Sequence, residues 1–171
     1  MENASRALLI AAAVLLGVMI ISIGAFLIFT FGGYAAEVEI ERAEAEISAF
    51  NAKFLKYEGA DNITIHQIIT LANMAIENNK QYELTNANAG DESTYYVQVI
   101  ANVKTKTSSN RKTNLTLLNA SGNPMVDFNE IIEENSYDIE LENRQVLYRC
   151  KSIKISPITR RVYSIELERI R

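Results

Sequence analysis

Residues 7–36 of the 171-residue chain read ALLIAAAVLLGVMIISIGAFLIFTFGGYAA and contain no charged side chain. About 20 residues of α-helix cross the hydrocarbon core of a bilayer, so this stretch is long enough to do so. We therefore expect a transmembrane helix over residues 7–31. The alternatives are a buried helix of a soluble domain and a signal peptide cleaved near Gly33-Tyr34-Ala35. The apolar part of a signal peptide spans only about 7–15 residues, which favours the uncleaved anchor.

Charges on the two sides of this stretch predict its orientation. Arg6 precedes the stretch, and the ten residues after it contain one arginine and five glutamates: Glu37, Glu39, Glu41, Glu44 and Glu46. Positively charged flanks tend to stay in the cytoplasm. We therefore expect a single-pass membrane protein with residues 1–6 in the cytoplasm and the C-terminal domain outside it.

Small residues in the apolar stretch predict contacts between helices. Ala13 and Gly17 are four residues apart, and Gly24 follows Gly17 by seven, so the three lie on one side of a helix. Such a stripe lets two helices approach closely in lipid. The alternative is that the stripe only reflects how common glycine and alanine are in membrane helices.

The helical pattern continues beyond the membrane stretch. Two rows of apolar residues recur every seven positions: Ile40, Ile47 and Phe54 in one, and Ala36, Ala43, Phe50 and Tyr57 in the other. They form a seam on an amphipathic stalk over residues 32–58, which ends at Glu58-Gly59. The seam either joins copies of the chain or packs on the protein's own sheet. The expected helix-packing residues are therefore Ala13, Gly17, Gly24, Ile40, Ala43, Ile47, Phe50 and Phe54.

Residues 59–171 predict a small α+β domain outside the membrane. A Thr-x-x-Gln capping box at Thr64 starts a second, short helix whose apolar pattern fades at Asn78. Alternating apolar side chains predict a strand over residues 95–103. The polar stretch 104–112 that follows is expected to form a turn.

The end of the chain predicts a small antiparallel sheet. We expect a short helix at residues 127–134 and a short strand at 139–141. Residues 146–155 and 161–170 predict a hairpin, and the shift of the apolar pattern at Ile153 indicates a bulge. The fold class is therefore α+β, with a long N-terminal helix, a second short helix and a C-terminal antiparallel sheet.

The residues predict no catalytic, cofactor-binding or metal site, so we do not expect an enzyme. His66 is the single histidine and has no Cys or His near it in the sequence, and Cys150 is the single cysteine. The net charge of −4 gives no reason to expect nucleic acid as a partner. One basic cluster contains Lys104, Lys106, Arg111 and Lys112. We expect it to form either a solvated hairpin tip or a contact for an anionic surface.

Both ends of the chain resemble a known class of protein. The opening MENASRALLIAAAVLLGVMIISIGAFLIF and the closing LYRCKSIKISPITRRVYSIELERI resemble small pilin-like membrane proteins of Gram-positive anaerobes. The layout also resembles type IV pilins and pseudopilins. The resemblance implies a structural or assembly protein of the cell envelope, a subunit of a filament or secretion apparatus. Its partners would be the lipid bilayer and either further copies of the chain or other envelope proteins. The alternative is a binding, sensor or adaptor domain on a membrane-anchored stalk.

Overall fold

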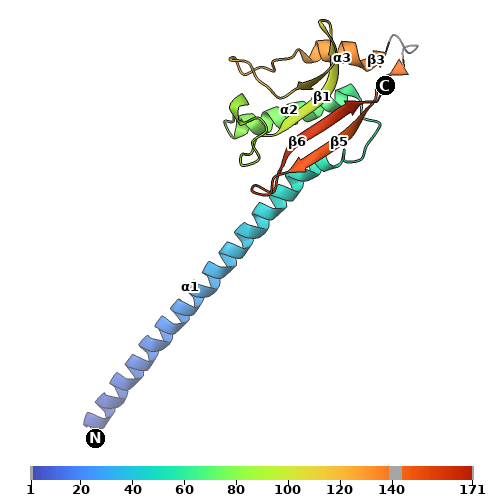
Figure 1. The fold of residues 1–171 in the computed structure, drawn as a ribbon. Coiled ribbons are helices and arrows are strands. Elements are labelled where there is room, and N and C mark those ends of the chain that lie inside the picture. Colours follow the sequence, from blue (N-terminus) through green and yellow to red (C-terminus); the bar gives the residue numbers. More distant parts are fainter. Residues whose placement is uncertain (1, 139–143, 171) are drawn as a thin grey trace. The chain divides into compact units, whose positions relative to one another are not determined.

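The computed structural model describes residues 2–138 and 144–170 and has an α+β fold (Figure 1). The chain divides into two compact units, Met1–Glu46 and Ile47–Arg171. The described helices are α1 (Glu2–Leu55), α2 (Ile65–Gln81) and α3 (Phe128–Ser136), with a short 3-10 helix η1 (Asn86–Asn88). The described strands are β1 (Gln98–Thr105), β2 (Ser108–Asn114), β3 (Tyr137–Asp138), β4 (Arg144–Gln145), β5 (Tyr148–Ile155) and β6 (Val162–Arg169).

Helix α1 confirms the expected long N-terminal helix. No proline interrupts it, and the hydroxyls of Ser22 and Thr30 donate to carbonyls one turn earlier, at 2.7 and 2.8 Å. The helix is long enough and apolar enough to cross a membrane, and its most apolar stretch has no residue buried inside the fold. After α1 ends at Leu55, Gly59 has a φ of +70°, a conformation that favours glycine after a helix.

Helix α2 begins as predicted and runs further than its apolar pattern suggests. The amide of Thr64 donates to Gln67 Oε1 at 2.9 Å, which is part of the expected capping box. The helix continues to Gln81 because Asn78 and Asn79, although polar, are buried and bond to the backbone near the start of β1. The buried face of α2 therefore extends past the last apolar residue.

Four strands form a mixed sheet in the order β2-β1-β6-β5. The outer pairs β1–β2 and β5–β6 are antiparallel, whereas the central pair β1–β6 is parallel. The predicted C-terminal hairpin is confirmed as β5 and β6. Its bulge is confirmed too, because the register shifts between Cys150 and Ser152, just before Ile153.

Three short predictions had different outcomes. The turn predicted for residues 104–112 is confined to Lys106 and Thr107, since β1 runs to Thr105 and the polar edge strand β2 begins at Ser108, with most of its side chains exposed. The short helix predicted near residues 127–134 is α3, and the side chain of Asp127 caps it by accepting from an amide. The strand predicted at 139–141 lies outside the described residues.

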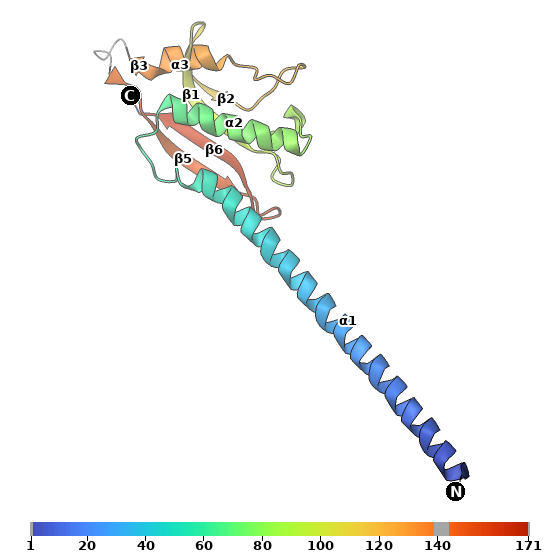
Figure 2. The same cartoon turned by 180° about the vertical axis from the view of Figure 1, so that it is seen from behind.

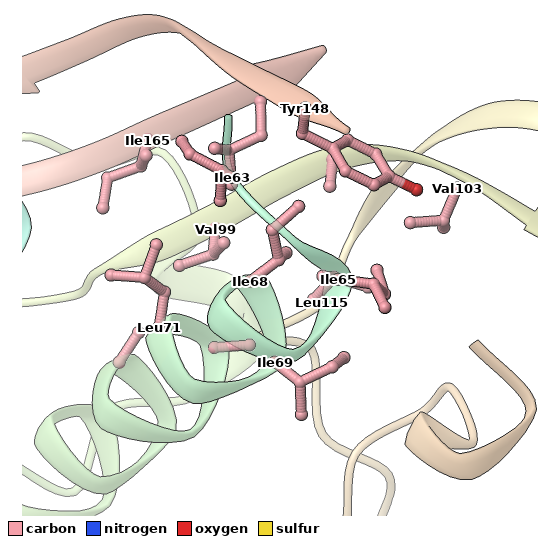
Figure 3. Packing of buried hydrophobic residues seen from close by; sticks show 14 of the residues in the cluster. Ile63, Ile65, Ile68, Ile69, Leu71, Val99, Val103, Leu115, Tyr148 and Ile165 are labelled. Carbon is pink, nitrogen blue, oxygen red and sulfur yellow. The ribbon is translucent and has the colours of Figure 1, made fainter. Parts of the chain in front are cut away.

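The hydrophobic core lies between one face of the four-stranded sheet and the helices α2 and α3 (Figures 2 and 3). On this face Val99 of β1 pairs with Ile165 of β6, and both side chains are fully buried. Ile68 and Leu71 of α2 pack against them (Figure 3). The other face is turned towards the viewer in Figure 1, and no helix of the unit Ile47–Arg171 covers it.

Candidate functional site

The small residues of the apolar stretch lie on an open helix surface. A Cβ atom added to Gly17 or Gly24 would meet no atom within 4 Å. Ala13 is exposed as well. No described contact within the chain therefore requires small residues at these positions, and their role in packing against other helices stays a prediction. The side chain of Ala36, from the second row of the seam, lies outside the described part of the chain.

The seam on α1 is divided between an exposed part and a buried part. Ile40 is 62% exposed, and Ala43 is exposed too. Ile47 and Phe50 are half-buried, and Phe54 is fully buried in the core of the unit Ile47–Arg171. The end of the seam thus packs on the protein's own domain, while its beginning remains available for another partner.

An arginine covers Phe50 on the domain side. The guanidinium carbon of Arg161 lies 4.0 Å from the centroid of the Phe50 ring, and 5.3 and 5.2 Å from the centroids of Tyr82 and Tyr95. Its Nη1 donates to the Tyr82 hydroxyl at 2.9 Å. A cation over aromatic faces is attracted by the ring electrons. These contacts hold Phe50 within its own chain, so Phe50 is less suited to a contact between subunits than Ile40 is.

A buried asparagine fixes the last turns of α1 to the β5–β6 turn. Asn51 Nδ2 donates to the carbonyl of Arg160 at 2.9 Å, and Asn51 Oδ1 accepts from the amide of Val162 at 2.8 Å. Asn51 was not among the residues predicted from the sequence. Its signal was a polar side chain between Ile47 and Phe54, on the apolar face of the helix.

A similar two-bond arrangement recurs at three other positions, and we call these three and Asn51 asparagine clasps. Asn51 bonds to two residues of one turn, whereas in the other three a side-chain amide bonds to both the N–H and the C=O of a single residue distant in the sequence, at 2.7–2.9 Å. The clasps therefore replace the backbone partners that these segments lack. The pairs are Asn79 with Val97, Asn135 with Lys104, and Asn86 with Leu118.

The side chains that could be the most reactive, such as those of His66 and Cys150, are not arranged for catalysis. His66 and Tyr137 line a cavity of about 90 Å³, whereas pockets for small ligands are about 300–1,000 Å³. Burial, and then the nearby Glu58 carboxylate, raise the pKa of the Cys150 thiol, which disfavours the reactive thiolate. Among the described residues, no group of three or more His, Cys, Asp or Glu side chains could hold a metal ion.

Comparisons with protein-family models, curated proteins and solved structures found no match. The function of the chain is therefore inferred from its own surfaces. Among the described residues, the apolar stretch of α1 and the exposed beginning of its seam are two surfaces that the chain itself leaves uncovered.

Proposed function

We propose that this protein is a membrane-anchored structural or assembly protein of the cell envelope, a pilin-like subunit of a filament or of a secretion apparatus. Residues 7–31 would span the membrane, residues 1–6 would lie in the cytoplasm and the domain would lie outside. The observation that carries the proposal is the apolar surface of α1, which its own domain does not cover. Between Leu8 and Phe31, many large apolar side chains are 44–80% exposed.

Exposing so large a continuous apolar surface to water is energetically unfavourable. Soluble monomers rarely expose apolar patches larger than a few hundred Å². The helix satisfies its own backbone hydrogen bonds, as a segment inside lipid must. Lipid can therefore cover most of the stretch, and the small-residue stripe can bring a second helix close.

Helix α1 has two candidate contact regions, the small-residue stripe and the exposed beginning of the seam. They point in different directions, which supports an assembly of several subunits. Ala13 and Ile40 are separated by 27 residues, and at 100° per residue they lie roughly opposite each other around the helix axis. Gly17 and Ile40 are roughly 140° apart by the same geometry. The two regions are also roughly 40 Å apart along the axis, so a straight neighbouring helix that packs along Ala13 would not contact Ile40. Each subunit would therefore contact at least two neighbours, as a filament subunit does and a simple dimer does not.

Photo-crosslinking in membranes tests this proposal. A diazirine side chain is placed at Ala13 or at Ile40 of the full-length chain, and matched controls carry it at Ile23 or Ser48, which point between the two regions. We expect crosslinks between copies from Ala13 and from Ile40, and far fewer from the controls. A chain with both groups should give ladders larger than dimers.

Two results would count against the assembly function. Equal crosslinking from all four positions would indicate random collisions in the membrane. Crosslinks from Ile40 to other proteins only, with none between copies, would favour a sensor or adaptor domain on a stalk.

A further inference from the structure

The uncovered face of the four-stranded sheet has the composition of a docking surface. Because register partners share a face, Gln98, Ile100 and Ser164 lie on the side opposite the core. Ile100 belongs to β1, one of the two central strands, and is half-buried, while no described helix of its unit lies over this face of the sheet (Figure 1). The loop at Gly90 lies over the Gln98 end of this face, where a Cβ at Gly90 would lie 3.7 Å from the Gln98 amide nitrogen and where Ser164 is buried.

Positive side chains surround this face. Lys112 of β2 and Lys151 of β5 both bond to Glu166 of β6, at 2.8 and 3.2 Å. Arg149 of β5 pairs with Glu168 of β6 at 3.7 Å. The Lys112 hydrogen bond lowers the pKa of Glu166 more than its slight burial raises it, and Lys151 lowers it further. Lys154, which pairs in register with Ser164, adds a fourth cation, so the cations named here outnumber the two carboxylates and this part of the face is net positive.

The segment of α1 at residues 37–46 has the opposite charge. It contains five exposed glutamates and one arginine, a net charge of −4 that equals the net charge of the whole chain. Glu37 and Glu44 lie on the same side of the helix as Ile40 and are roughly 10 Å apart along its axis. Four strands span about 14 Å from the first to the last. A helix laid across this face would therefore place both carboxylates above the sheet, with Ile40 between them.

We propose that the uncovered sheet face binds residues 37–46 of α1 from a second copy of this chain. The inference rests on the proposed assembly function and names the two surfaces that meet. Ile40 covers Ile100, and the glutamates meet the lysines of the outer strands. The acidic segments of two parallel stalks at the same height would repel each other, which favours this contact over direct pairing of stalks. The two surfaces differ, so each copy offers one of each, and the contact extends into a polymer unless the rotation closes it into a ring.

Charge reversal in the full-length chain tests the contact. The stalk-reversed variant is Glu37→Lys with Glu44→Lys, and the face-reversed variant is Lys112→Glu with Lys154→Glu. A matched control reverses two exposed lysines away from the face, Lys53→Glu with Lys80→Glu. Sedimentation in nonionic detergent measures association, and tyrosine circular dichroism confirms that each variant is folded.

We expect each reversed variant to self-associate about ten-fold more weakly or worse, and the control to associate as the native chain does. Mixing the two reversed variants should restore association, because the altered stalk of one then meets the altered face of the other. A chain with all four substitutions should associate with itself. Native association should weaken between about 0.1 M and about 1 M salt, where the Debye length falls from about 10 to about 3 Å.

Three outcomes would overturn the inference. The first is a native chain that stays monomeric at low salt. The second is association that neither reversed variant weakens, in which case crosslinks from Ala13 would still support the assembly function. The third is recovery in the four-substitution chain without recovery in the mixture, because that pattern indicates a contact within one chain.

Discussion

Replacing Asn79 by aspartate should destabilise the domain by an amount that depends on pH. Asn79 is 1% exposed, its Nδ2 donates to the Val97 carbonyl at 2.9 Å, and its Oδ1 accepts from the Val97 amide at 2.8 Å. Aspartate has almost the same shape, but its second oxygen would face the carbonyl oxygen instead of donating to it. Asn79→Asp therefore removes one bond and buries a negative charge beside an acceptor.

The size of the effect follows from the cost of protonation. A protonated carboxyl can donate to the Val97 carbonyl and restore both bonds, so the penalty cannot much exceed the cost of keeping that proton. With an unfolded pKa of about 3.9, this cost is about 4 kcal/mol at pH 7 and about 1.5 kcal/mol at pH 5. Burial raises the pKa of the introduced carboxyl in the folded state. The stability of the variant therefore matches the native chain below pH about 4 and is lost as the pH rises.

Chemical denaturation from pH 4 to 7 measures this dependence. The full-length chain is unfolded in detergent, and near-ultraviolet circular dichroism follows tyrosines such as the buried Tyr96 and Tyr148. Asn110→Asp is the matched control, since it makes the same change on the exposed strand β2 and should alter stability by less than about 0.5 kcal/mol. A penalty for Asn79→Asp that is the same at pH 4 and pH 7, or as small as that of the control, would refute the clasp argument.

Four further predictions test the core, the anchor, the topology and the thiol. Phe54→Ala should cost about 3–5 kcal/mol because Phe54 is fully buried, whereas Ile40→Ala should change the unfolding free energy by less than about 0.5 kcal/mol. Val18→Arg should weaken membrane insertion by about 2.5–3.5 kcal/mol, and unchanged resistance to alkaline extraction of the membranes would contradict the span. A cysteine at Ser109 in a Cys150→Ser background should react with an impermeant reagent on intact cells; labelling only after lysis would reverse the topology. In the native chain, alkylation of Cys150 should have a pH midpoint above the ordinary thiol pKa of about 8.5, and a lower midpoint would contradict its burial.

The elements that the sequence predicted well depend on neighbouring residues. The charge-free run of residues 7–36 and the seven-residue spacing that follows identify α1, because helical periodicity is a local property. The capping box at Thr64 and the bulge near Ile153 were also readable, since both are patterns within a few positions. Strand β2 was missed because it lies at the sheet edge with most side chains exposed, so it has no alternation to detect.

For the candidate site, the sequence determined which residues of α1 are apolar, and only the tertiary structure decided what covers them. Phe54 and Ile40 belong to the same row of the seam, yet the first is buried in the domain and the second is exposed. The parallel pairing of β1 with β6 and the four asparagine clasps were equally hidden. Each joins groups separated by 18 or more residues, and an asparagine on an apolar helix face does not show which distant backbone group it will meet. Local periodicity fixes the shape of each element, whereas burial is fixed by the surfaces that those elements bring together.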